Sequence, residues 1–207
     1  MIHKQYHHGD LKNALIKAGT EILSEEGVAE LSLRKVAARA GVSHSAPYAH
    51  FSDKQALIAA ISTEGFRQLN ARLSSISDAC QTEPARLLLE VAFAYVQFAL
   101  DSSACFKLMF SGVLEKEKDY PDFVAISKAS FQLLVTLVQR CQQVGLIRPG
   151  DPDVLAVSIW SLVHGFTALL LERQISSHIL DRFTIKALLC QTLNQVVLTE
   201  IQPVETD

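Results

Sequence analysis

The segment Leu33–Phe51 constrains the fold of this chain most, because it predicts two short helices joined by a tight turn. Val36, Ala37 and Ala40 form an apolar stripe with helical spacing, which gives the first helix one buried face. Gly41 follows where a helix ends in the left-handed conformation that glycine adopts without a Cβ clash. A helix, a glycine turn and a second helix make a helix-turn-helix, which places one helix in the major groove of DNA.

The start of the second helix has two solutions in the sequence. If Ser43 is the N-cap, Pro47 removes the first hydrogen bond within the helix. If Ser45 is the N-cap, Pro47 occupies the second helical position at little cost. We expect a displaced or tightened start. A glycine-linked helical hairpin that serves only as a packing unit is the alternative interpretation.

The composition is that of a helical protein with a large core. The chain has 207 residues, of which 49% are hydrophobic, and a net charge of −3, so it is not a generally basic nucleic-acid-coating protein. The sequence shows no sustained strand-type alternation and no apolar signal core near its start. Four widely spaced cysteines are expected to be buried free thiols in a reducing compartment: Cys80, Cys105, Cys141 and Cys190.

The sequence predicts an all-α chain of about nine helices. Asp10, Ser32 and Asp151 are the expected N-caps, and Ser52 is expected to open a capping box with Gln55. Besides the two helices of Leu33–Phe51, helices are expected over about 10–26, 52–77, 84–100, 104–112, 122–144, 152–173 and 182–201.

The run Val154–Leu171 is apolar enough to require a membrane check. It contains two serines, a histidine and a threonine, and basic clusters do not flank it. A membrane span normally needs about 20 apolar residues. We therefore expect a helix buried in a core or a subunit interface, and no membrane association.

The N-terminal part of the chain, which we call the head, resembles the tetracycline-repressor (TetR) family of bacterial transcription regulators. The resemblance rests on Ala29–Ser43, Tyr48–Phe51 and Lys54, and it extends to Tyr6–Leu11 at the start. In the rest of the chain, which we call the body, Trp160–Gly165 is similar to the Trp-His-Gly type of C-terminal regulatory domain. Phe106–Gly112 fits the same branch of the family.

The resemblance implies a DNA-binding domain over residues 1–55 and a helical ligand-binding and dimerisation domain over 56–207. It implies a cytoplasmic homodimer that binds a pseudo-palindromic operator, most often as a repressor, and that a small apolar effector releases. No cofactor, metal or catalytic activity is expected.

The family pattern also implies which side chains meet DNA. Tyr48, His50 and Lys54 are the expected phosphate contacts, and Arg34 is a further candidate for phosphate or a groove edge. The front of the second helix is expected to approach base edges through Ser43, His44, Ser45 and Ala46. His3, His7 and His8 allow a zinc site, but a polar arm near DNA is the favoured interpretation.

The body offers a candidate effector pocket and a candidate dimer surface. His164 lies one helical turn after Trp160, where a hydrogen-bonded histidine is favoured over a catalytic base. The pocket candidates are Phe66, Phe93, Phe98, Phe106, Met109, Phe110, Trp160 and His164. The dimer candidates, on the last two long helices, are Gly165, Phe166, Leu188, Leu189, Thr192 and Val196.

Two other functions fit parts of the sequence. A helical metabolite-binding protein without a DNA function would keep the body and leave the head without a role. A small helical enzyme would need a nucleophile, acid or base constellation, and the sequence contains no recognisable one. Salt-dependent binding to a palindromic DNA fragment separates the regulator from both.

Overall fold

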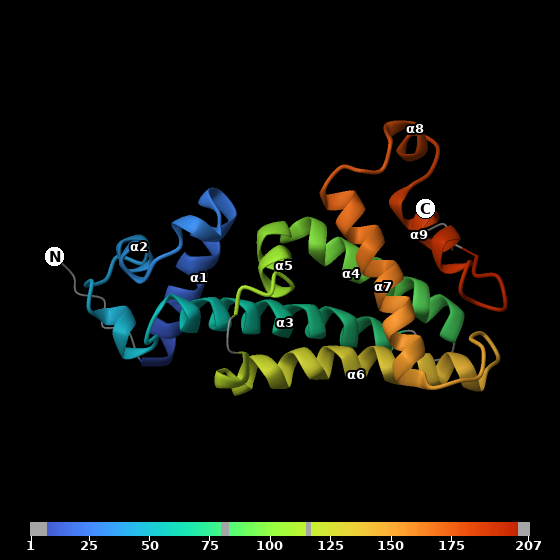
Figure 1. The fold of residues 1–207 in the computed structure, drawn as a ribbon, viewed down its shortest axis with the longest axis horizontal. Helices are drawn as coiled ribbons and strands as arrows, with labels where there is room; N and C mark the ends of the chain where they lie inside the picture. Colours follow the sequence, from blue (N-terminus) through green and yellow to red (C-terminus); the bar gives the residue numbers. More distant parts are fainter. Residues whose placement is uncertain (1–7, 80–82, 115–116, 203–207) are drawn as a thin grey trace. The chain divides into compact units, whose positions relative to one another are not determined.

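The computed structural model describes residues 8–79, 83–114 and 117–202 (Figure 1). These residues form nine α-helices and three short 3-10 helices and contain no strand, which confirms the predicted all-α class. Contacts divide the chain into two compact units. Unit 1 runs to Arg67 and includes Ser102–Ser127, and unit 2 comprises Gln68–Asp101 and Lys128–Asp207.

Unit 1 is built on α1, which packs against both α2 and α5. The apolar face of α1 is buried, and Leu15 and Ile22 are fully enclosed. The elements that lie wholly in unit 1 are α1 (His8–Glu26), η1 (Val28–Glu30), α2 (Leu33–Arg39), η2 (Ala46–Ala49), α5 (Ser103–Met109) and η3 (Glu117–Asp119). The first parts of α3 (Lys54–Ala79) and α6 (Pro121–Gln143) complete it.

Unit 2 has three mutually packed helices at its centre, namely α4 (Pro84–Asp101), α7 (Pro152–Leu171) and α9 (Ile185–Leu193). Figure 1 shows α7, in orange, crossing α4, in green. Their apolar side chains form the core of the unit, with Leu87, Leu88 and Leu189 almost completely buried. The short helix α8 (Ser177–Leu180) lies between α7 and α9, and the remaining parts of α3 and α6 belong to this unit.

Several helix ends follow the local signals in the sequence. Ser32 Oγ accepts a hydrogen bond from Lys35 N at 3.2 Å and caps α2. Asp151 caps α7 by accepting from two backbone amides, with Pro152 as the first helical residue. Gly27 ends α1 with a φ of +86°, where a residue with a Cβ would be strained.

Two predicted caps are wrong. Helix α1 begins at His8, so Asp10 lies inside the helix and is not its N-cap. Helix α3 begins at Lys54, and Asp53 Oδ1 accepts from Ala56 N at 2.8 Å, so Asp53 replaces Ser52 as the cap. A carboxylate is favoured there because it accepts the free amide and also opposes the positive end of the helix dipole.

The predicted last helix over 182–201 is also wrong, because α9 is much shorter. The Asn194 side chain accepts from Ile201 N at 2.8 Å and donates to Ile201 O at 3.0 Å. These two bonds fold the chain back after α9, and Ile201 is buried. The expected loop before the helix contains α8.

Candidate nucleic-acid interface and effector site

The turn between α2 and α3 is built as the sequence predicts. Gly41 has a φ of +69°, and Val42 N donates to Ala37 O at 3.0 Å across the end of α2. This pairing satisfies a carbonyl at the end of the helix and sends the chain away from its axis. The glycine turn of the helix-turn-helix is therefore confirmed.

The second helix of the motif is a single 3-10 turn, η2, and not an α-helix. Pro47 has no N–H to donate to Ser43 O, and Ala46 N donates to that oxygen instead, at 3.0 Å. The spacing of three residues is the 3-10 pattern. Ser45 occupies the N-cap position, but its side chain does not cap the turn; its hydroxyl is instead hydrogen-bonded to that of Ser43 at 3.1 Å. The tightened start that Pro47 predicts is thus present.

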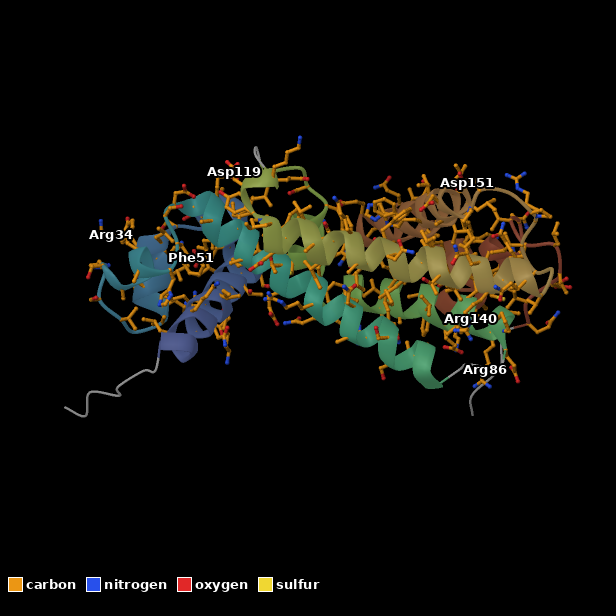
Figure 2. The ribbon with its side chains drawn as sticks, turned by 90° about the horizontal axis from the view of Figure 1, so that it is seen from below. Arg34, Phe51, Arg86, Asp119, Arg140 and Asp151 are labelled. Atoms are coloured by element: carbon orange, nitrogen blue, oxygen red, sulfur yellow. The ribbon has the colours of Figure 1, made fainter. Side chains whose placement is uncertain are left out.

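The residues in and around the 3-10 turn divide between core and solvent. Pro47 is buried, and Phe51 is 2% exposed beneath the turn. Tyr48, by contrast, is 62% exposed. Ser43, His44, Ser45 and Arg34 are also exposed, whereas Ala46 is half-buried. Figure 2 shows the Arg34 side chain reaching outward from α2 and Phe51 lying among other side chains.

The other two expected phosphate contacts are less accessible. Lys54 is the first residue of α3, and its Nζ donates to Ala29 O at 3.2 Å. His50 is half-buried, and its Nε2 atom is enclosed without a hydrogen-bond partner among the described residues. His3, His7 and Cys80 lie outside the described residues, and the side chain of His8 is not described either.

The predicted pocket residues fall into two groups, one in each unit. In unit 1, Phe66 packs edge-on against Phe110 and Phe123 at centroid distances of 5.4 and 5.8 Å, and Phe106 lies 5.0 Å from Phe110. Met109 is buried beside this cluster and lies so close to α3 that a Cβ at Gly65 would stand 2.6 Å from its sulfur. These side chains form the core of unit 1.

The second group contains a polar chain between α4 and α7. Trp160 Nε1 donates to Tyr95 Oη at 3.3 Å, and Tyr95 Oη lies 2.8 Å from His164 Nδ1. Because an indole can only donate, Tyr95 Oη accepts from Trp160, while the donor in the Tyr95–His164 bond is set by the histidine tautomer. Burial raises the pKa of Tyr95 and lowers that of His164, so both side chains are neutral near pH 7.

The remaining two pocket candidates of unit 2 lie elsewhere on α4. Phe98 is buried, and Phe93 lies 5.3 Å beneath the ammonium group of Lys186 from α9. Lys186 also pairs with Glu90 at 2.8 Å. A hollow of about 410 Å³ that the sequence does not predict lies between the end of α7 and α8, lined by Leu170, Arg173, Ile175, Ser177 and Leu180.

The sequence misses Tyr95, which joins Trp160 to His164. Its signal is a tyrosine within the apolar run of α4, because a buried phenol needs a hydrogen-bond partner. The identity of that partner depends on how α4 packs on α7, which the sequence does not encode locally.

The pH dependence of stability tests the state of His164. Its pKa is 6.5 when unfolded and lower when folded, so between these values only the unfolded chain binds the proton. The stabilisation is therefore complete above pH 6.5 and is lost as the pH falls through the folded-state pKa. We expect thermal denaturation between pH 7.5 and 5 to show a smaller loss of stability for His164→Gln than for the wild type. His178→Gln, at an exposed histidine, is measured beside it as the control for the substitution itself.

The predicted dimer residues divide between surface and core. Phe166 and Leu189 are buried within the protomer, so they pack its core and offer little surface to a partner. Leu188, Thr192 and Val196 are half-buried, and Val196 lies beyond the end of α9. A Cβ at Gly165 would meet no other atom of the described chain within 4 Å, so no helix of the protomer closely approaches α7 at this glycine.

One face of α7 is exposed and largely apolar. Val154, Val157 and Leu169 are 62%, 47% and 50% exposed, and they flank a stripe of small residues comprising Ser158, Ser161, Gly165 and Ala168. We call these seven residues the α7 face. By length and composition alone, both α6 and α7 would be able to cross a membrane.

The cysteine prediction holds where the structure describes it. Cys105, Cys141 and Cys190 are buried free thiols. Burial raises the pKa of Cys105 and Cys141 to about 11, which keeps both sulfurs in the unreactive thiol form.

Comparison with known families identifies both parts of the chain. Residues 15–61 match the model of the bacterial regulatory proteins of the tetR family, and residues 88–191 match the tetracyclin repressor-like C-terminal domain. The chain belongs to the TetR family. It is a ligand-responsive DNA-binding transcription regulator, with its helix-turn-helix in the N-terminal match.

Solved structures share the whole fold. A protein of unknown function from Rhodococcus sp. RHA1 is 32% identical with a TM-score of 0.76, over 93% of this chain and 96% of that one. A tetR-family regulatory protein from Rhodococcus RHA1 is 19% identical with a TM-score of 0.70, over 90% and 96%. The fatty acid degradation regulator FadR from Bacillus halodurans is 15% identical with a TM-score of 0.71, over 91% and 95%. No curated protein matches the chain.

Proposed function

We propose that this regulator is a cytoplasmic repressor that binds a pseudo-palindromic operator as a homodimer and is released by a small apolar effector. The observation that carries the proposal is the exposed turn Ser43–Tyr48, which is supported from below by Pro47 and Phe51. A turn supported in this way keeps its shape when it meets DNA, so less conformational entropy is lost on binding.

The position of that turn in the chain assigns DNA binding to the N-terminal part and the other functions to the rest. Residues 1–55 bind DNA, and residues 56–207 dimerise and bind the effector. Tyr48, Lys54 and Arg34 contact phosphates, with His50 beside them, while Ser43, His44, Ser45 and Ala46 face base edges. His164 has a structural role in this proposal, because its Nδ1 atom is hydrogen-bonded to Tyr95 Oη between two helices.

The α7 face supports the homodimer. Two-fold symmetry places this face against the same face of the second subunit. The contact buries three exposed aliphatic side chains per subunit and allows the two α7 helices to approach closely at Gly165. Leu188, Thr192 and Val196 extend the contact. A dimer presents two turns to two half-sites of one operator. The same burial accounts for the apolar character of α7 without a membrane.

The apolar effector is supported by the aromatic side chains of unit 2, which include Phe93, Phe98 and Trp160, and by the fatty acid degradation regulator with the same fold. Trp160 and His164 add polar groups to an otherwise apolar environment, a combination that fixes the orientation of a ligand. A ligand that prefers one spacing of the two heads shifts the dimer away from the DNA register.

Release by an effector is tested with operator DNA selected from a random-sequence library by the full-length protein. Fatty acids and acyl thioesters of increasing chain length are then titrated into the complex, and fluorescence anisotropy follows the DNA. We expect at least one chain length to weaken DNA binding tenfold or more, since coupling energies are typically about 1–3 kcal/mol. If protein saturated with a bound ligand, shown by native mass spectrometry, holds the operator as tightly as free protein, the coupling is absent.

A further inference from the structure

The surface between α1 and α2 carries a network of ion pairs that the helix-turn-helix signal does not predict. Arg39, the last residue of α2, pairs with Glu25 at 2.8 Å, with Glu26 at 3.5 Å and with Glu21 at 3.8 Å. Lys35, one turn earlier, pairs with Glu26 and, at 3.1 Å, with Glu30. Two cations of α2 thus share four glutamates of α1 and η1, and Glu26 joins the two halves.

The network leaves the three cations of α2 in different states. The neighbouring carboxylates raise the pKa values of Lys35 and Arg39, so both stay charged while their charge is neutralised locally. Arg34 forms no ion pair with any described residue, and its side chain reaches outward (Figure 2). Neutralised cations displace few counterions from DNA, whereas a free one displaces about one.

The position of Arg39 allows its ion pairs to hold the end of α2 against α1. Arg39 is followed directly by Ala40 and Gly41, where the chain turns toward Ser43. Its pairs tie the end of α2 to α1 at the point from which the DNA-contacting turn departs. A planar guanidinium that meets several carboxylates limits the rotation of the helix better than one point charge does.

We propose that Arg39 is a positioning residue for operator binding, which holds α2 on α1 and masks the glutamates, while Arg34 is the cation of α2 that meets DNA phosphate. The assignment rests on the operator binding proposed above. Without Arg39, the end of α2 is released and Glu21, Glu25 and Glu26 repel the DNA backbone.

Salt dependence separates the two roles. Affinity for the library-selected duplex is measured between 50 and 300 mM KCl for wild type, Arg34→Gln and Arg39→Gln dimers. For Arg34→Gln, the slope of log affinity against log salt should shrink by about 2, one unit per subunit. For Arg39→Gln, affinity should fall roughly tenfold, and the slope should change by well under 2, because repulsion by the glutamates is screened by salt but no phosphate contact is lost. A slope that shrinks by about 2 for Arg39→Gln would assign Arg39 to phosphate and overturn the proposal.

A double variant supplies the second test. Arg39→Gln combined with Glu25→Gln removes one repelling carboxylate together with its partner, so the share of the affinity that was lost to repulsion by Glu25 should return. If Arg39 contacts DNA directly, the double variant stays as weak as Arg39→Gln. Far-UV circular dichroism checks folding, and the double variant, which also lacks the cation, takes the place of Arg39→Gln in the slope comparison if the single variant is unfolded.

The selection experiment distinguishes a failure of the proposed operator binding from a failure of the positioning role of Arg39. A wild-type protein that enriches no sequence from the library contradicts operator binding itself, and the positioning role falls with it. Enrichment by the wild type, followed by an Arg39→Gln variant with unchanged affinity, contradicts only the positioning role.

Discussion

Replacing Tyr48 by alanine should weaken operator binding roughly hundredfold while leaving the dimer intact. A hydrogen bond to a charged group contributes about 1.5 kcal/mol or more, and a two-fold dimer loses this contact twice. Tyr48 is 62% exposed, so its loss leaves no cavity in unit 1 and should not change stability. Fluorescence anisotropy with the selected duplex measures the affinity, and sedimentation velocity measures the oligomer.

The phenolic oxygen can be separated from the ring by a matched variant. Tyr48→Phe should bind as weakly as Tyr48→Ala if the hydroxyl donates to phosphate, and nearly as well as wild type if the ring packs on the sugar. Because tyrosine is uncharged, neither variant should alter the salt slope. Wild-type affinity in Tyr48→Ala would remove this residue from the interface.

The parts of the fold that the sequence predicts are those decided within a few residues. Gly41 ends α2 as predicted, because its backbone enters the left-handed region with a positive φ. Ser32 and Asp151 cap helices through amides two or three residues away. The tightened turn at Pro47 follows from one missing N–H.

Where two local signals compete, the sequence alone does not decide between them. Ser52 and Asp53 are both good caps, and the observed choice depends on where the chain leaves Phe51, which is fixed by burial against the core. The apolar residues after Leu193 suit a continued helix. The helix ends because the Asn194 amide pairs with the backbone of Ile201, seven residues away.

The contacts that build the site come from packing between distant helices. Tyr95 and His164 are 69 positions apart, and Arg39 meets Glu25 across the turn between α1 and α2. Periodicity identifies the buried face of each helix but not the partner of each side chain. Residue types therefore predict the kind of site, but only the three-dimensional structure shows which side chains contact one another.

Placing carboxylates on the α7 face should convert the dimer to monomers and abolish tight operator binding. Val157→Asp and Leu169→Asp together remove two exposed aliphatic side chains, and each substitution occurs twice in a symmetric dimer. At about 1.5 kcal/mol for each lost aliphatic contact, the dimer loses about 6 kcal/mol, before the cost of burying unpaired carboxylates. Sedimentation velocity at micromolar protein should show a single monomer boundary.

A second apolar pair on the same unit serves as the matched control. Val144 and Leu198 are 61% and 66% exposed and lie outside the α7 face, so Val144→Asp with Leu198→Asp adds the same charge elsewhere. This variant should remain dimeric and bind the selected duplex with wild-type affinity. Loss of the dimer in the control alone would move the interface to the turn after α6 and the segment after α9. A dimer that survives in the α7 variant would leave that face without its proposed partner.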